Sequence, residues 1–405
     1  MTTNQLPRAL DDLRVLDLTD AKGIYCTRLF ADMGADVLRV EPPGGDFARR
    51  RPPFVDDLPG PERSLYHFVM NASKRSITLD IETEDGAALL RRIARSADIV
   101  IESFAPGYLD SLDLGYEDLA RENPAIIVTS ISPFGKGGPY EDWEGPDIVN
   151  MGLGGQLYLS GFPGEPPAIP WGEQSYYQGA LHGAYATMIA LTYRDLTGQG
   201  QAIDVSIQEC VATAMETAMQ FYDLQGYVRT RTGSQRRAAG FGLYPCADGF
   251  ILWMAGARNF ENLIEWMKSE GVDTAEFETP QWSDQHYRLE HGDEFDQKFI
   301  PWGMTHTKAE LAETGQAQHL PNAPIQTVAE IVSDPHLRER QYYVDVDHPE
   351  LGRTITYPGP PYRLQKTPAR IRRAPLLGEH NWQIYREELG LSLQEIATLS
   401  GAGVI

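Results

Sequence analysis

Short apolar runs alternate with helix-spaced apolar positions along the first third of the chain. The apolar runs predict buried strands at Arg14–Leu18, Val37–Glu41, Arg75–Ile81, Asp98–Glu102 and Ile126–Ile131. Between them, Ile24–Met33 and Glu84–Ser96 repeat apolar residues at helical spacing, which predicts amphipathic helices. This alternation predicts an α/β fold with a parallel sheet, and such sheets bind ligands at the carboxyl ends of their strands. We therefore expect a site in the segments that follow Glu41, Glu102 and Ser132.

The chain is organised around Pro170–Thr192, which reads as a loop that runs into a long helix. Its many small residues, such as Gly179 and Gly183, allow another backbone to approach closely. Ser175 and, three residues later, Gln178 match a capping box, which predicts that the helix begins at Tyr176. A helix N-terminus behind a glycine-rich loop favours an anion or a reacting carbonyl. A well-capped core helix without any such role explains the same pattern.

The second half of the chain has a more mixed pattern. It predicts a strand at Gln201–Ser206, helices at Gln208–Leu224 and Val328–Glu339, a hairpin at Tyr244–Ala255 with its turn at Asp248-Gly249, and a hairpin formed by Tyr342–Asp347 and Thr354–Tyr357. The basic loop Arg229–Gly242 is typical of a domain boundary. We expect a large domain over 1–225, a small domain over 226–325, and a return to the large domain over 326–405.

Charge and cysteine usage narrow the class of protein. A formal net charge of −22 at pH 7 argues against non-specific binding to nucleic acid, because phosphates repel such a field. The three cysteines, Cys26, Cys210 and Cys246, are widely spaced and show neither a disulfide framework nor metal-ligand spacing. No apolar run is long enough to span a bilayer, and the first residues, MTTNQLPRALDDLR, do not show the apolar h-region that a secretory leader would have. We expect a cytoplasmic protein that binds neither metal nor membrane.

Five stretches of the chain form a set of motifs in a familiar order. They are residues Leu13–Asp46, Asn71–Leu119, Ile126–Tyr140, Thr197–Glu209 and Arg373–Ser392. This set resembles the class III CoA-transferases, the family of formyl-CoA transferase and carnitine CoA-transferase. The resemblance implies a Rossmann-like large domain, with a parallel sheet, that is built from both chain ends. It also implies a smaller α+β domain and a dimer of two interlocked chains.

The resemblance further implies a reaction that begins with an aspartate. That carboxylate attacks an acyl-CoA thioester to give a mixed anhydride, and the released CoA thiolate returns to form an aspartyl-CoA thioester. The acceptor acid then attacks and CoA moves onto it. The expected ligands are therefore an acyl-CoA and a small carboxylic acid, with no tightly bound cofactor. A glycine-rich loop near Gly233–Gly242 would cover the site, with Gly240 in the substrate pocket.

The position of the family aspartate holds a serine in this chain. That aspartate stands four residues before the glycine of the central helix, here Gly179, which makes Ser175 its counterpart. A serine hydroxyl is protonated at pH 7, and helix capping accounts for Ser175. The main hypothesis is a non-catalytic subunit whose paralogous partner carries the aspartate, as in the succinyl-CoA:benzylsuccinate CoA-transferases of anaerobic aromatic degradation. Trp171, Tyr176 and Tyr177 would suit an aromatic acid.

The expected CoA-binding cations are also depleted. Positions where the family has basic residues hold Pro42, Glu82, Ser111 and Ser132. The residues left for CoA are Lys22, Lys74, Arg75, Leu79 and Phe104. Loss of these cations predicts weak binding of the CoA phosphates.

Two alternatives to the non-catalytic subunit stay open. One is a homodimeric CoA-transferase in which Glu173 replaces the aspartate as the acyl-accepting carboxylate. The other is an acid-binding protein of the same fold without transfer activity. Racemase chemistry is not expected, because Gly145-Pro146-Asp147 lacks the histidine that racemase relatives have at its middle position.

Overall fold

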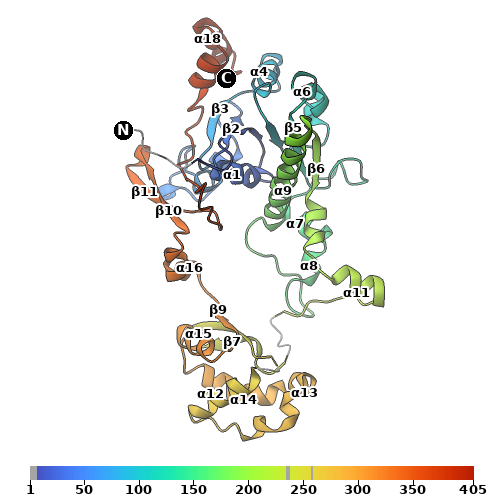
Figure 1. The fold of residues 1–405 in the computed structure, drawn as a ribbon, viewed down its shortest axis with the longest axis vertical. Helices are drawn as coiled ribbons and strands as arrows, with labels where there is room; N and C mark the ends of the chain where they lie inside the picture. The colour runs from blue at the N-terminus through green and yellow to red at the C-terminus, as the bar shows by residue number, and fades with distance from the viewer. Residues whose placement is uncertain (1–6, 234–237, 257–258) are drawn as a thin grey trace. The chain divides into compact units, whose positions relative to one another are not determined.

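The computed structural model describes residues 7–233, 238–256 and 259–405. They form two compact units, coloured along the chain in Figure 1. The first unit comprises Met1–Tyr158, Ile169–Arg229 and Arg338–Ile405, so both chain ends contribute to it, as the resemblance implies. The second comprises Leu159–Ala168 and Thr230–Leu337.

The first unit is built on a six-stranded parallel sheet. Its strand order is β3-β2-β1-β4-β5-β6. The strands are β1 (Arg14–Leu18), β2 (Asp36–Glu41), β3 (Arg75–Thr78), β4 (Ile99–Glu102), β5 (Ile127–Ser132) and β6 (Ala202–Ser206). The predicted α/β fold and parallel sheet are confirmed. Strand β3 ends earlier than predicted, because the N–H of Asp80 bonds to the C-terminal Val404 carbonyl instead of to a strand.

Helices cover both faces of this sheet. One face packs against α4 (Glu84–Ala94) and against the C-terminal segment through Tyr385 and Val404. The other face packs against α1 (Ile24–Asp32) and α9 (Gln174–Thr197). Further helices of this unit are α2 (Phe47–Arg50), α3 (Leu65–Met70), α5 (Tyr108–Ser111), α6 (Tyr116–Glu122), α7 (Asp147–Leu153), α10 (Ile207–Thr213), α11 (Ala218–Gln225), the π-helical turn Trp382–Glu388 and α18 (Leu393–Gly401).

The central helix α9 approaches the sheet through its glycines. A Cβ atom on Gly179 would lie 2.7 Å from Ile207, and one on Gly183 would lie 2.7 Å from Ile131. The small side of this helix therefore has the packing role that its sequence indicates. The predicted start of the helix is wrong, because α9 begins at Gln174 and Ser175 does not cap it.

Two predicted helices are interrupted. The segment 207–225 divides into α10 and α11, since Glu216 between them adopts a left-handed backbone with φ of 51°. The segment 328–339 divides into α16 (Val328–Ser333) and α17 (Pro335–Glu339), because Pro335 disfavours a helical conformation at Asp334. The hairpin of β10 (Tyr343–His348) and β11 (Arg353–Pro358) forms as predicted.

The second unit has an antiparallel sheet of order β7-β8-β9. Its strands are β7 (Phe241–Cys246), β8 (Gly249–Met254) and β9 (Asn322–Pro324). Cys246 pairs with Gly249, so the turn is Ala247-Asp248 and lies one residue before the predicted position. An aromatic core that includes Trp253 and Phe299 packs against helices. These helices are α12 (Phe260–Ser269), α13 (Gln285–Glu290), α14 (Gly292–Gly303) and α15 (Lys308–Ala317).

Candidate functional site

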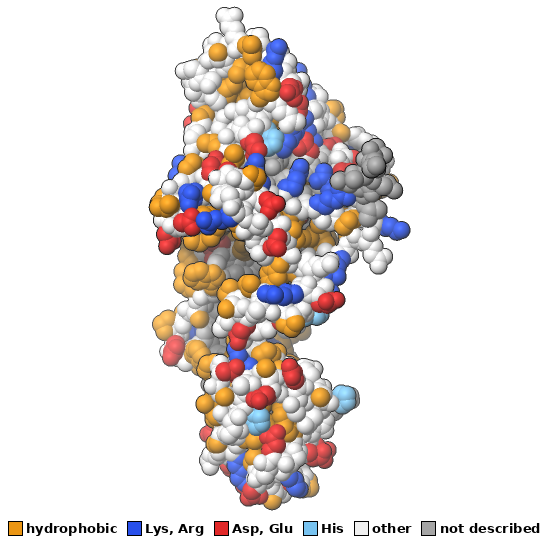
Figure 2. Space-filling view, turned by 90° about the vertical axis from the view of Figure 1, so that its left-hand side faces the viewer, with side chains coloured by type: hydrophobic (Ala, Val, Ile, Leu, Met, Phe, Trp, Pro, Cys, Tyr) orange, Lys and Arg blue, Asp and Glu red, His pale blue; other side chains and the backbone are white. Residues whose placement is uncertain are grey.

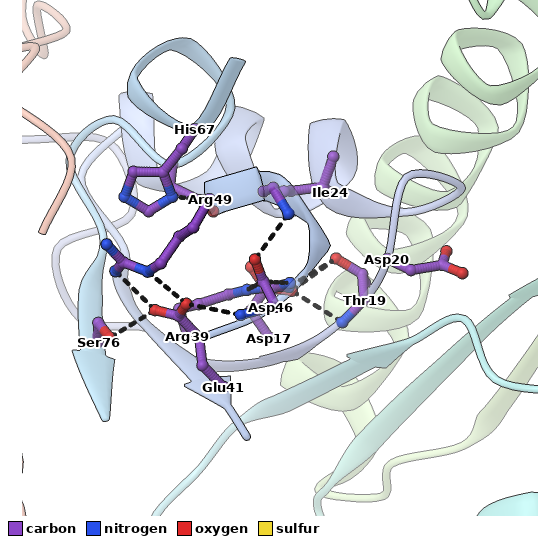
Figure 3. A network of polar contacts seen from close by, with 12 residues as sticks. Asp17, Thr19, Asp20, Ile24, Arg39, Glu41, Asp46, Arg49, His67 and Ser76 are labelled. Carbon is purple, nitrogen blue, oxygen red and sulfur yellow. Dashed lines mark hydrogen bonds and ion pairs between the residues drawn. The ribbon is translucent and has the colours of Figure 1, made fainter. Parts of the chain in front are cut away.

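A network of buried charges joins β1, β2 and the residue before β3 (Figure 3). Asp17 on β1 accepts hydrogen bonds from Arg39 Nη1 at 2.8 Å and from Lys74 Nζ at 2.9 Å. Arg39 also binds Asp46, which caps α2 through the Ala48 N–H. Burial raises the pKa of Asp17, but Arg39 and Lys74 more than offset this and hold it well below its usual range. The loop after β2 is therefore anchored to β1.

A second group of buried contacts fixes the end of β2. Arg49 on α2 donates to Glu41 from Nε at 2.6 Å and from Nη2 at 2.8 Å, a bidentate pair. Ser76 on β3 donates to the same carboxylate at 2.7 Å (Figure 3). These contacts hold the carboxyl end of β2 against α2 and β3.

Two of the basic residues predicted to bind CoA, Lys74 and Arg75, already have carboxylate partners in the structure. The ammonium of Lys74 is fully buried and donates to Asp17, Thr27 and Asn71, so it has no free position for a phosphate. Arg75 is the first residue of β3, at the amino end of the strand, and it pairs with Asp36 and Glu388. Neither residue lines the cleft at the carboxyl ends of the strands.

A cleft of about 970 Å³ lies at the carboxyl ends of the strands, where the sequence predicts a site. Its walls come from the segments after β1 to β5 and include Lys22, Leu79 and Phe104, three of the predicted CoA contacts. The ring of Phe104 lies 4.6 Å from that of Tyr108, which forms an aromatic wall. The structure thus brings these three predicted residues together.

The lining of this cleft is strongly acidic. It contains two basic residues, and both are engaged, Lys22 with Asp20 and Arg39 with Asp17 and Asp46. Its seven acidic residues are Asp20, Asp46, Asp80, Glu82, Glu141, Asp142 and Glu144. Such a lining repels an anion that carries several phosphate charges.

Ser175 is fully buried and bonds to a carboxylate that sequence reasoning did not assign to the site. Its Oγ donates to Asp147 Oδ1 at 2.7 Å, and its backbone N–H donates to the same oxygen at 2.8 Å. Asp147 is the first residue of α7 and directly follows Gly145-Pro146. This proline-to-helix start is the signal that could have marked it. Position 175 thus supplies two hydrogen-bond donors to Asp147.

The residues around Ser175 differ in exposure. Glu173 precedes α9, and its Oε2 accepts from Arg51 Nη1 at 2.7 Å, so its charge is paired. Trp171 is 96% exposed and is not among the residues that line the acidic cleft. Tyr176 is half-buried, and burial with nearby carboxylates, first Asp20, raises its pKa to about 12.

Gly240 lies in the second unit. It adopts a φ of 71° beside Ala255 and Leu263. Residues 234–237 of the predicted covering loop lie outside the described residues.

His67 on α3 lies against the buried network and is neutral at pH 7. Its Nε2 lies 3.1 Å from the Pro375 carbonyl, and its Nδ1 lies 2.9 Å from the Asn71 side-chain nitrogen. The Asn71 oxygen accepts from Lys74, so its nitrogen faces His67 as a donor. Burial, and then the charge of Arg49, lower the pKa of His67 to about 4. A proton on Nδ1 would place two N–H donors face to face, so the contact with Asn71 also disfavours the charged form of His67.

We expect this histidine to make stability depend on pH. Between pH 6.5 and 4 the unfolded chain binds a proton that folded His67 excludes, so the stability falls as the pH falls. The free energy of unfolding of the wild type, relative to His67→Gln, should decrease by roughly 2 kcal/mol from pH 7 to pH 5. Urea unfolding of both proteins at each pH measures this, and a difference that stays constant would contradict it.

The described residues provide neither a metal site nor a membrane-spanning helix. No group of three or more His, Cys, Asp or Glu side chains among them is arranged to hold a metal ion. None of the helices described is long and apolar enough to cross a membrane. The three cysteines are buried and unbridged, and burial raises the pKa of the Cys26 thiol.

Known proteins resemble this chain over almost its whole length. The model of CoA-transferase family III matches residues 10–381. The BbsE subunit of succinyl-CoA:(R)-benzylsuccinate CoA-transferase from Thauera aromatica is 37% identical, with 97% of each chain covered. The succinyl-CoA–D-citramalate CoA-transferase of Chloroflexus aurantiacus is 35% identical, with 100% of each chain covered.

A solved structure agrees with these sequence matches. It is a CaiB/BaiF family protein from Brucella suis, with a TM-score of 0.86 and 29% identity, and the match covers 95% of this chain and 100% of that one. The fold, the motifs and the full-length matches lead to one conclusion. This chain belongs to CoA-transferase family III.

Proposed function

We propose that this chain is the non-catalytic subunit of a hetero-oligomeric CoA-transferase that moves CoA from succinyl-CoA to a carboxylic acid. A paralogous subunit would carry the acyl-accepting aspartate. The relative from Thauera aromatica is itself named as a subunit of a succinyl-CoA:(R)-benzylsuccinate CoA-transferase. The single observation that carries the proposal is the hydrogen bond from Ser175 to Asp147.

That hydrogen bond makes Ser175 a poor acyl acceptor. Transfer begins with an ionised oxygen that attacks the thioester carbonyl and displaces the CoA thiolate. The hydroxyl of Ser175 keeps its proton and donates it to a carboxylate. Carboxylates have pKa values near 4 in model peptides, so they are weak bases for an alcohol. An ester on serine would also be harder than an anhydride to convert back to a thioester.

The charge of the cleft supports the same proposal. A CoA thioester carries several negative charges on its phosphates, and productive sites supply arginine or lysine for them. In this cleft the cations Lys22 and Arg39 are already paired with carboxylates. We therefore expect the productive CoA to bind in the partner subunit.

The outer side of α9 supports assembly with a second chain. Large apolar side chains are exposed along this helix, at Leu181, Tyr185, Met188, Ile189, Tyr193 and Leu196. Its opposite side packs against the sheet. A helix that is apolar on all sides is normally buried on all sides, so this surface favours a partner subunit of the same family.

The test compares this chain alone with its complex. The substrates are succinyl-CoA and the two acids in the names of the relatives described above, benzylsuccinate and D-citramalate. We expect the chain alone to transfer CoA at least about 100-fold more slowly than the complex that co-purifies from its source, a difference of roughly 3 kcal/mol in barrier. Full activity of the isolated chain would contradict the proposal.

The alternative that uses Glu173 is tested in the same assay. Glu173 is ion-paired with Arg51, and this pairing weakens a carboxylate as a nucleophile. We expect Glu173→Gln to leave the rate of the complex within about twofold, less than 0.5 kcal/mol in barrier. Loss of nearly all activity in this variant, with an unchanged complex by native mass, would favour the alternative.

A further inference from the structure

A second cleft lies at the amino ends of the strands, whereas the acidic cleft lies at their carboxyl ends. Its volume is about 620 Å³, and its walls include the starts of β2 and β3 and the segment 372–383. Figure 2 shows Lys and Arg side chains gathered on this side of the first unit. The four arginines that line the cleft are Arg8, Arg75, Arg372 and Arg373. They are unexpected in a chain with a net charge of −22.

Two of these arginines have carboxylate partners. Arg75 binds Asp36 with Nε at 2.7 Å from Oδ1, and Nη1 lies 2.9 Å from Glu388. Arg373 binds Glu379 through two nitrogens, at 2.8 and 2.5 Å. Asp36 and Glu379 also line the cleft, so they neutralise these two cations and leave the other pair.

Arg8 and Arg372 have no carboxylate partner in the described part of the chain. The guanidinium of Arg372 makes one long bond of 3.3 Å, to the Ser73 carbonyl. Residues 1–6, 234–237 and 257–258 contain no Asp or Glu, so they hold no carboxylate for either arginine. The Arg8 side chain packs over Gly34, since a Cβ on Gly34 would lie 2.4 Å from the Arg8 Cβ and 2.8 Å from its Cδ. This packing holds the first part of the Arg8 side chain beside the cleft.

The arrangement places like charges near Arg372. Burial lowers the pKa of Arg372, and the nearby positive charges of Arg8 and Arg75 lower it further, while the carboxylate of Asp36 offsets part of this effect. Like charges in a partly desolvated cleft repel each other more strongly than they would in water. An anion between the guanidinium groups would remove this repulsion.

We propose that Arg8 and Arg372 form a binding site for a phosphate-class anion in this cleft. Guanidinium forks match the oxygens of phosphate and can bind them with two hydrogen bonds each. The volume falls within the range of small-molecule sites, which admits a pyrophosphate or the phosphate of a nucleotide. The site lies at the amino ends of the strands, so it is separate from the cleft that contains Leu79 and Phe104.

The test is calorimetric titration of the full chain at low ionic strength with three probes. These are sodium phosphate, sodium pyrophosphate and adenosine 3′,5′-bisphosphate. We expect saturable binding of pyrophosphate with Kd below ~1 mM, and at least about tenfold weaker binding in Arg8→Gln and in Arg372→Gln. Arg372→Lys should recover part of the affinity. Much tighter binding of the bisphosphate than of pyrophosphate would identify a nucleotide phosphate as the ligand, and equal binding a free anion.

A matched control separates this site from general electrostatics. Arg121 lies on the surface and pairs with Asp118, so Arg121→Gln removes the same charge away from the cleft. We expect this variant to bind pyrophosphate as the wild type does. Equal weakening in Arg121→Gln, or no saturable binding by the wild type, would overturn the proposal. The result does not depend on the proposed function, because it requires no partner and no transfer.

Discussion

Replacement of Asp17 by asparagine should lower the free energy of unfolding by about 3–5 kcal/mol. Asp17 is fully buried and carries the only formal negative charge within hydrogen-bond reach of the Lys74 ammonium among the described contacts. It also shares Arg39 with Asp46. An asparagine of the same shape would leave Lys74 as an uncompensated buried charge, which is far more costly than loss of a surface pair.

Equilibrium unfolding in urea measures this change, with Asp118→Asn as its control. Asp118 makes a comparable ion pair with Arg121, but the Arg121 side chain is 72% exposed. We expect that control to change stability by less than about 1 kcal/mol. If the two variants lose similar amounts of stability, the buried network does not hold the first three strands together as described.

Replacement of Ser175 by aspartate should destabilise the chain by about 2–4 kcal/mol at pH 7.5. Ser175 Oγ lies 2.7 Å from Asp147 Oδ1, so a carboxylate at position 175 would face a second one within hydrogen-bond distance. Two carboxylates this close cannot both ionise freely, and the pKa of one is raised. Since its folded pKa would then exceed its unfolded value, the penalty applies above that pKa and disappears as the pH falls through it.

Two further variants isolate the charge effect at position 175. Ser175→Asn has the shape of aspartate without its charge, so it should lose clearly less stability at pH 7.5. Adding Asp147→Asn to Ser175→Asp replaces the repulsion with an amide donor and should restore most of the stability. Unfolding measured at pH 7.5 and pH 5 tests both variants. A Ser175→Asp chain as stable as the wild type at pH 7.5 would show that Asp147 does not contact position 175.

Local sequence patterns predict much of the fold correctly. Strands such as Arg14–Leu18 and helix α4 follow from runs and spacing of apolar residues that bury one continuous surface. The position of the acidic cleft follows from the rule that ligands bind at the carboxyl ends of parallel strands. Lys22, Leu79 and Phe104 lie there for this reason.

The roles of Lys74 and Ser175 depend on residues that are distant in the sequence. Lys74 looked like a free cation, but its partner Asp17 stands 57 residues earlier. The sequence predicts that Ser175 caps a helix, but Asp147, 28 residues earlier, accepts hydrogen bonds from its hydroxyl and from its N–H. Neither pairing leaves a local pattern, because both depend on how the strands and helices meet. The same holds for the cleft of Arg8 and Arg372, whose residues come from the two ends of the chain.

The most direct test of the non-catalytic role is to locate the covalent CoA intermediate. The active complex is mixed with succinyl-CoA, quenched in mild acid and digested, and the peptides are identified by mass spectrometry. We expect the CoA thioester on an aspartate of the partner subunit and on no residue of this chain. A CoA adduct on Glu173 or Asp147 of this chain would contradict the account.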